Sequence, residues 1–177
     1  EACRERNIPV RNVAGYSTDS VVQATFMHIL SLLGNAPYYD NTVKNGTYSA
    51  GTLFTDVSRS FYEIRGKRIG IVGMGAIGTG VARVAEAFGM EIVYYSTSGT
   101  GHCREWPSIS LEELMRTSDV ISIHAPYNER TAGLIGEAEL AMMKPTAIIV
   151  NMGRGGIVDE AALAQAIDND SIANRKS

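Results

Sequence analysis

An apolar stretch that runs directly into a glycine-rich turn restricts the fold of this chain more than any other feature. Residues 69–72 are Ile-Gly-Ile-Val, residues 73–78 are Gly-Met-Gly-Ala-Ile-Gly, and a helix-forming stretch follows at once. In such a strand–turn–helix unit the first glycine allows a tight turn, the second lets a ligand approach the backbone, and the third lets helix and strand pack closely. The glycines in these three positions are Gly73, Gly75 and Gly78. The helix N-terminus would present free N–H groups to an anion, so the turn predicts a site for the pyrophosphate of a dinucleotide.

From residue 67 onward, strand-like and helix-like segments alternate. The expected strands are 69–72, 92–95, 120–123 and 147–150. The expected helices are 76–88, ending at Gly89, then 110–116, opened by a capping box of Ser110 and Glu113, then 137–143, and 160–167, capped by Asp159. Near-continuous apolar strands separated by helices are typical of a parallel sheet that is covered on both faces. The sequence therefore predicts an α/β fold with a doubly wound parallel sheet, the Rossmann-type architecture.

The N-terminal third of the chain predicts one long helix followed by irregular structure. Ser20 and Gln23 match a capping box, which places the start of the helix at Ser20. Gly34 and Pro37 are expected to end it. The segment 38–57 is rich in aromatic residues and glycine, and we expect a loop with short helical turns there.

Composition limits the classes of function that the chain can have. Its 177 residues are enough for one domain of ordinary size. A net charge of −3 gives no electrostatic basis for binding nucleic acid. No apolar run approaches the roughly 20 residues that a membrane helix needs, and the N-terminus lacks a signal-peptide pattern. The two cysteines, Cys3 and Cys103, have no partner at CxxC spacing, so we expect reduced thiols in a cytoplasmic protein without a metal site.

Further runs accompany the glycine turn in a fixed order. They are residues 12–21, residues 122–126 with Thr131, residues 143–145 (Met-Lys-Pro), and residues 151–160 (Asn-Met-Gly-Arg-Gly-Gly-Ile-Val-Asp-Glu). Together with the turn they resemble the D-isomer-specific 2-hydroxyacid dehydrogenase family. The resemblance covers nearly the whole chain, and its last run is the most specific.

The resemblance implies a division of the chain into two parts. Family members have two similar α/β domains with the active site between them, and the cofactor domain is inserted into the substrate domain. By this correspondence residues 1–16 are a remnant of the substrate domain and hinge, followed by a hinge helix. Residues 17–177 are the dinucleotide-binding domain without its C-terminal edge strand, so the strand at 147–150 is expected to have an unpaired edge.

The resemblance also places the acid–base machinery of the family outside this chain. His28, His102 and His124 are its histidines, and none of them matches the catalytic histidine of the family. That histidine and the carboxylate that pairs with it belong to segments beyond residue 177. We therefore expect negligible dehydrogenase activity from the isolated chain.

Arg154 is the candidate catalytic residue. Reduction of a 2-oxo acid requires that the carboxylate be held and the carbonyl polarised while hydride arrives. A guanidinium can do both through its rigid two-point fork, and a preorganised positive charge stabilises the developing alkoxide. The alternative is a strand-end arginine in a surface ion pair, but the family run around Arg154 favours the catalytic role.

The family also implies which residues contact the cofactor. Besides the three glycines they are Ala76, Ile77, Ser96, His124, Ala125, Pro126, Thr131, Met152, Gly153 and Arg154. Ala76 stands where the family often has an arginine, so only its backbone can serve the pyrophosphate. Gly153 replaces a more usual alanine or serine, and we expect a more flexible loop there.

The choice between NAD and NADP depends on the end of the second expected strand. NAD enzymes place an Asp or Glu there to hold the ribose hydroxyls, whereas this chain has Ser96. The negative charge that would repel a 2′-phosphate is therefore absent. No arginine is adjacent to bind such a phosphate, and Arg104 is the nearest one in the sequence. NAD is the expected cofactor, and NADP remains open.

The function that these features predict is hydride transfer between NAD(P) and a 2-oxo or D-2-hydroxy acid. The sequence does not identify the acid. The alternative is a dinucleotide-binding module without catalysis, similar to the corepressors related to these dehydrogenases. By the same resemblance, the helix at 20–33 and the loop after it build the two-fold dimer of the family, which predicts a homodimer.

Overall fold

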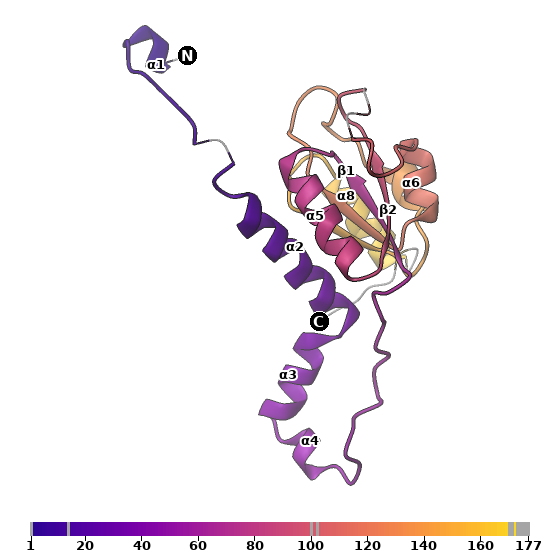
Figure 1. Ribbon diagram of the computed structural model, residues 1–177. Coiled ribbons are helices and arrows are strands. Elements are labelled where there is room, and N and C mark those ends of the chain that lie inside the picture. The colour runs from indigo at the N-terminus through magenta and orange to yellow at the C-terminus, as the bar shows by residue number, and fades with distance from the viewer. Residues whose placement is uncertain (1, 14, 100, 102, 170–171, 173–177) are drawn as a thin grey trace.

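A parallel sheet forms the centre of the molecule. The structure is a computed structural model that describes residues 2–13, 15–99, 101, 103–169 and 172. The strands are β1 (Arg68–Val72), β2 (Glu91–Tyr95), β3 (Val120–Ile123) and β4 (Ile148–Asn151). They lie in the order β2-β1-β3-β4, and every neighbouring pair is parallel. The observed sheet confirms the predicted α/β architecture (Figure 1).

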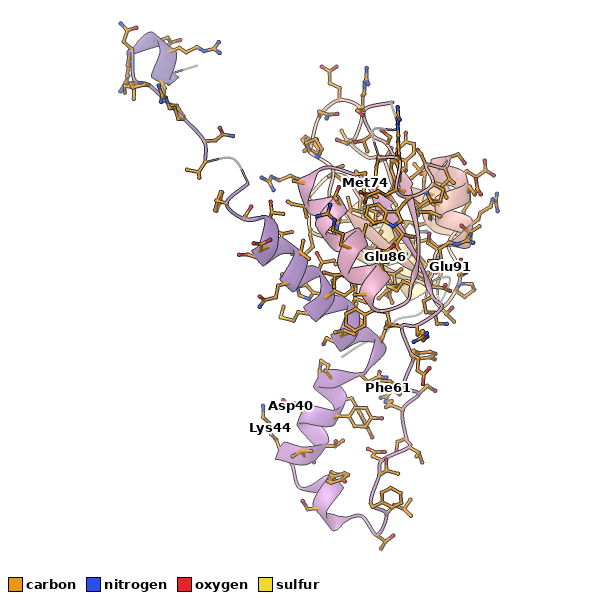
Figure 2. All side chains as sticks on the ribbon, in the orientation of Figure 1. Asp40, Lys44, Phe61, Met74, Glu86 and Glu91 are labelled. Atoms are coloured by element: carbon orange, nitrogen blue, oxygen red, sulfur yellow. The ribbon has the colours of Figure 1, made fainter. Side chains whose placement is uncertain are left out.

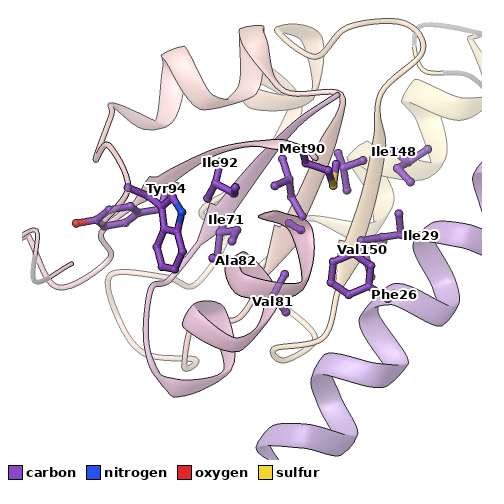
Figure 3. Packing of buried hydrophobic residues seen from close by; sticks show 14 of the residues in the cluster. Phe26, Ile29, Ile71, Val81, Ala82, Met90, Ile92, Tyr94, Ile148 and Val150 are labelled. Carbon is purple, nitrogen blue, oxygen red and sulfur yellow. The ribbon is translucent and has the colours of Figure 1, made fainter. Parts of the chain in front are cut away.

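Helices cover both faces of this sheet. The helices in the described part of the chain are α1 (Ala2–Glu5), α2 (Thr18–Leu33), α3 (Ala36–Lys44), α4 (Thr47–Ala50), α5 (Ala76–Ala87), α6 (Leu111–Thr117), α7 (Glu137–Ala141) and α8 (Glu160–Asp168), and five of them pack on the sheet. α2 and α5 pack on one face, where Phe26, Ile29 and Val81 meet apolar residues of the strands (Figure 3). α6, α7 and α8 cover the other face, so the sheet is doubly wound.

Alternate residues of β1 supply the two cores. Ile69 and Ile71 are fully buried on the face covered by α2 and α5, whereas Val72 is buried on the face covered by α6. Gly70 lies between them, and a Cβ there would come within 2.6 Å of the Leu114 side chain. The missing side chain therefore lets α6 lie close against the sheet, because interiors are packed too densely to absorb an extra group without strain.

Most helix ends follow the predicted signals. The N-terminus of α6 is capped by Ser110, whose Oγ accepts a hydrogen bond from the Glu113 N–H at 3.1 Å. Asp159 caps α8 by accepting from the N–H groups of Ala161 and Ala162. Gly89 follows α5 with a φ of 73°, the left-handed conformation that often ends a helix. These three predictions are confirmed.

The predicted start of the first long helix is wrong. α2 begins at Thr18 with Ser17 at the N-cap position, and Ser20 lies inside the first turn. The Ser17 side chain accepts no capping hydrogen bond. Asp19 lies in the first turn, where a negative charge is favourable beside the free N–H groups. The apparent capping box is thus a chance match, because the helix begins earlier, at Thr18, and the negative charge of Asp19 stabilises its first turn.

The segment after α2 is more helical than predicted. Pro37 does not mark the end of α2, which Gly34 ends, but lies in the first turn of α3. Proline is tolerated at that position because the first N–H groups of a helix have no intrahelical partner. α3 extends over nine residues from Ala36 to Lys44, and most of it lies in the segment 38–57, where a loop with short helical turns was expected.

α3, α4 and the returning segment 51–63 form an arm that extends away from the sheet (Figure 1). Figure 2 shows the side chains on this arm, with Asp40, Lys44 and Phe61 labelled. Phe54 is 91% exposed, and several other large apolar side chains of the arm are exposed as well. Large apolar side chains that stay exposed together on one segment are typical of an interaction site.

β4 lies at one edge of the sheet. In the described part of the chain it pairs only with β3, and the unpaired edge expected from the sequence stays a prediction. Within the same part of the chain, none of the helices has the length and apolar character required to span a bilayer.

Candidate functional site

The glycine turn lies where the sheet changes direction. From β1 the chain proceeds to β2 on one side, whereas β3 pairs with the other side of β1. Such a switch point leaves a crevice beyond the carboxyl ends of the strands, where open α/β sheets bind ligands. Met74, at this end of the sheet, is labelled in Figure 2. The position of the turn therefore fits a ligand site.

Gly73 and Gly78 make the turn compact. Gly73 has a φ of 95°, and its N–H donates to the Tyr95 carbonyl oxygen at 3.0 Å. A Cβ on Gly73 would lie 3.0 Å from the backbone of Ala125. A Cβ on Gly78 would overlap the carbonyl oxygen of Gly73, so only glycine lets α5 start so close to β1.

Gly75 has a different environment. It is the N-cap of α5 with a φ of −86°, a conformation that any residue adopts. A Cβ on Gly75 would meet no atom within 4 Å. The protein fold therefore does not require glycine there, whereas a ligand that approaches the helix N-terminus would. This open space beside free N–H groups fits a pyrophosphate.

A cleft of about 680 Å³ adjoins the turn, a volume in the usual range for small-ligand sites. Its lining comes from the start of α5 and from the segments that follow β3 and β4. The residues are Ile77, His124, Ala125, Pro126, Tyr127, Met152, Gly153, Arg154 and Gly155. The structure thus brings together seven of the residues proposed from sequence, because only Tyr127 and Gly155 were not among them.

The remaining proposed residues lie around this cleft. Gly73, Gly75, Ala76 and Gly78 form the turn and the first helical residues above it. Ser96 follows β2, with its Oγ 3.1 Å from that of Ser98. Their contacts with a cofactor remain predictions.

Thr131 lies in the protein interior instead of the cleft. It is fully buried, and its Oγ1 donates to the Pro126 carbonyl oxygen at 2.6 Å. Thr131 Oγ1 also accepts a hydrogen bond from the Asn128 N–H at 2.9 Å. Thr131 therefore fixes the shape of the segment that carries Pro126, and a role in cofactor binding would be indirect.

Arg154 is held at the cleft by a hydrogen-bonded loop. Its Nη1 donates to the Gly153 carbonyl oxygen at 2.9 Å, and its side chain is exposed. Asn151, the last residue of β4, donates from Nδ2 to the Arg154 carbonyl oxygen at 3.0 Å. Its Oδ1 accepts from the Gly153 N–H, also at 3.0 Å. Sequence analysis assigned no role to Asn151, although this side chain organises the loop.

Gly153 packs closely against the segment that follows β3. Its N–H is engaged by Asn151, so the loop is fixed at this point. A Cβ on Gly153 would lie 2.8 Å from the Ala125 carbonyl oxygen and 3.2 Å from the Ile157 side chain. The glycine therefore permits close approach of the segments after β3 and β4, and the flexibility of the loop stays a prediction.

His124 is a largely buried histidine on the cleft wall. Its Nε2 lies 2.8 Å from Ser122 Oγ. Among the described residues, none pairs with its buried Nδ1. Burial lowers the pKa of His124 from 6.5 to about 4, so the ring is neutral at pH 7. A neutral ring adds no charge to this wall of the cleft. His28 is exposed on α2, and His102 lies outside the described residues.

The pKa of His124 predicts that the chain loses stability in mild acid. Between pH 6.5 and 4 the unfolded chain binds a proton at His124 that the folded chain does not, so the free energy of unfolding falls as pH falls. The expected loss is about 2 kcal/mol between pH 7.5 and pH 5. Urea denaturation at both pH values measures it. His124→Asn should flatten this dependence and exposed His28→Asn should not; an unchanged slope in His124→Asn would contradict the assignment.

The sheet, the turn and the cleft together define a Rossmann-type dinucleotide-binding domain. A sequence model described as "D-isomer specific 2-hydroxyacid dehydrogenase, NAD binding domain" matches residues 26–175. The chain belongs to this family, which confirms the resemblance and the class of cofactor.

Several known proteins are similar to the chain. Glyoxylate reductase from Aeropyrum pernix is 40% identical over 177 residues, an alignment that covers 98% of this chain and 53% of the relative. D-lactate dehydrogenase from Aquifex aeolicus, solved with NAD and lactic acid, aligns with a TM-score of 0.82 at 32% identity, covering 97% of this chain and 50% of that one. An acyclic imino acid reductase, solved with NADPH and D-arginine, aligns with a TM-score of 0.85 at 31% identity. The alignment covers 97% of this chain and 54% of that one. The chain thus spans about half the length of the curated relatives it matches.

Proposed function

We propose that this chain is the cofactor-binding part of an NAD(P)-dependent oxidoreductase that interconverts a 2-oxo acid and a D-2-hydroxy acid. The observation that carries the proposal is the position of Arg154 at the cleft beside the glycine turn. The family and the names of the similar proteins support the same chemistry.

Each part of the site has a task in this proposal. The open space at Gly75 admits the pyrophosphate to the free N–H groups of α5. The bound nicotinamide supplies or accepts the hydride. Arg154 holds the carboxylate of the acid with two parallel hydrogen bonds, and its charge stabilises the oxygen of the reacting carbonyl. Apolar contacts from Ile77 and Met152 line the cleft and limit access of water.

The test uses oxamate, an isostere of a 2-oxo acid that resists reduction. Calorimetry should show one nucleotide bound per chain, and oxamate should bind to the nucleotide complex but not to the free chain. The dependence on nucleotide is the discriminating result, because it requires both sites to share one cleft. Binding of nucleotide without any effect of oxamate would contradict the oxidoreductase proposal.

We also propose the division of the chain made from sequence, with residues 1–16 outside the cofactor domain. α1 contributes no buried residue, whereas α2 buries Phe26, Ile29 and Leu33. In Figure 1 the segment before α2 extends away from the sheet. These observations support a boundary close to the start of α2.

We propose a homodimer formed through the arm of α3, α4 and residues 51–63. The exposed apolar side chains there, Phe54 above all, support this assignment. Sedimentation equilibrium at about 20 μM should give twice the chain mass. Phe54→Asp should shift the equilibrium towards monomer and leave nucleotide binding unchanged. A native chain that sediments as a monomer would contradict the dimer.

A cytoplasmic location is likewise part of the proposal. Cys3 is exposed and Cys103 half-buried, and both are free thiols. Free exposed thiols are typical of a reducing compartment.

A further inference from the structure

An arginine that is distant in the sequence lies against the loop that follows β2. Arg130 donates from Nη1 to the Ser98 carbonyl oxygen at 3.3 Å. The two residues are 32 positions apart, so the contact exists only in the folded chain. Arg104 is the arginine nearest to Ser96 in the sequence, and in the described part of the chain it makes no hydrogen bond to this loop.

The loop that Arg130 contacts is where a dinucleotide fold recognises the adenosine ribose. In such folds a carboxylate after this strand binds the ribose hydroxyls, whereas an arginine nearby accommodates a 2′-phosphate. Residues 95–99 are Tyr-Ser-Thr-Ser-Gly, so the loop offers hydroxyl groups and no carboxylate. The Tyr95 carbonyl oxygen accepts from the Gly73 N–H at 3.0 Å, which fixes this loop beside the pyrophosphate turn.

The backbone that carries Arg130 is held in place. Its N–H donates to Asn128 Oδ1 at 2.9 Å, and Thr131 anchors the same segment from the protein interior. The Arg130 guanidinium makes no ion pair with a carboxylate of any described residue. Its charge is therefore not neutralised within the described fold and is available to an anion.

We propose that Arg130 and the hydroxyl-bearing loop 96–98 form a 2′-phosphate site, so that the chain prefers NADP(H) to NAD(H). This inference rests on the proposed function, because it assigns a subsite of the same cofactor cleft. An arginine fork matches a phosphate geometrically, and its charge-assisted hydrogen bonds are stronger than those between neutral groups. Arg130 thus determines the specificity for the cofactor.

The test compares nucleotides that differ only in the 2′-phosphate. The native chain should bind NADPH about tenfold more tightly than NADH, measured by nicotinamide fluorescence, and 2′,5′-ADP more tightly than 5′-AMP. Arg130→Ala should abolish both preferences and leave the affinity for NADH unchanged. Arg130→Lys should retain part of the preference. Arg104→Ala, which removes the same charge from the arginine nearest in sequence, should keep all of it.

The results that would overturn the 2′-phosphate site differ from those that would overturn the proposed function. Equal affinities of the native chain for NADPH and NADH would overturn the 2′-phosphate site and leave the proposed function standing, as would a preference that survives Arg130→Ala. If Arg104→Ala lost the preference for NADPH and Arg130→Ala kept it, Arg104 and not Arg130 would bind the 2′-phosphate, and the proposal would be wrong. Failure to bind any of the nucleotides would overturn the proposed function together with this inference.

Discussion

Replacement of Gly75 by threonine is expected to weaken NADH binding about 100-fold while the stability of the chain stays close to native. The space beside Gly75 is empty of protein atoms within 4 Å, and its φ of −86° suits any residue. Threonine is about as good as glycine at a helix N-cap, so the fold should tolerate it. Its side chain would occupy the space reserved for the pyrophosphate and remove about two charge-assisted hydrogen bonds.

The same turn offers a contrasting substitution. A Cβ on Gly78 would overlap the Gly73 carbonyl oxygen, which is backbone and cannot move aside easily. Gly78→Val should therefore lower the free energy of unfolding by about 3 kcal/mol in addition to impairing NADH binding. We therefore expect glycine at position 75 to be needed for binding of the ligand and glycine at position 78 to be needed for stability of the fold as well. Thermal unfolding and NADH titration of both variants measure this separation.

Gly136 provides the matched control for Gly75. It is also a helix N-cap with extended backbone, and a Cβ there would make only an ordinary contact at 3.6 Å. Gly136→Thr should preserve both stability and NADH affinity. If Gly75→Thr bound NADH as tightly as the native chain does, the assignment of the pyrophosphate to this turn would be incorrect.

Substitution of Arg154 is expected to remove the affinity for 2-oxo acids. Arg154→Ala eliminates both hydrogen bonds to the carboxylate, and the affinity of the nucleotide-loaded chain for oxamate should fall about 100-fold. Arg154→Lys keeps the charge but not the fork, so it should recover only part of that affinity. Calorimetric titration of oxamate into the NADH complex measures the effect.

Arg116 serves as the control for Arg154. It pairs with Glu112 on α6 and lies shortly before the amino end of β3, whereas the cleft is lined by segments that follow the carboxyl ends of β3 and β4. Arg116→Ala should leave the affinity for NADH and the affinity of the NADH complex for oxamate unchanged. Should Arg154→Ala retain oxamate affinity, the carboxylate would have to be bound by another group.

The central sheet and the turn could be predicted because their signals are local. The expected strand at 147–150 (Ala-Ile-Ile-Val) is apolar throughout, and the spacing of the glycines in the turn restricts the conformation of the backbone. The caps at Ser110 and Asp159 were predictable for the same reason, since each side chain bonds N–H groups within its own first turn.

Other features depend on parts of the chain that are distant in sequence. The contact between Arg130 and Ser98 requires the loops after β2 and β3 to lie side by side. The close packing at Gly153 requires the backbone of Ala125 beside it, and no pattern around Gly153 reveals that neighbour. Asn151 was within the family run, but its role emerges only once both of its hydrogen bonds are seen.

Local signals were also misleading where they compete. Ser20 and Gln23 have capping-box spacing, yet α2 starts at Thr18 because packing of Phe26 and Ile29 on the sheet stabilises the helix whichever cap is present. Pro37 is compatible with the end of one helix and with the start of the next. The short connection between α2 and α3 leaves only the second role.

Hydrogen exchange with and without NADPH tests the central claim most directly. A pyrophosphate at the helix N-terminus and a nicotinamide in the cleft should slow exchange of the amides in residues 74–79 and 151–155. Exchange of the amides of residues 47–57, which belong to the arm, should be unaffected. Gly75→Thr should abolish the protection of residues 74–79 and 151–155. If NADPH left the amides of 74–79 unprotected, or protected the arm instead, the glycine turn would not be the cofactor site.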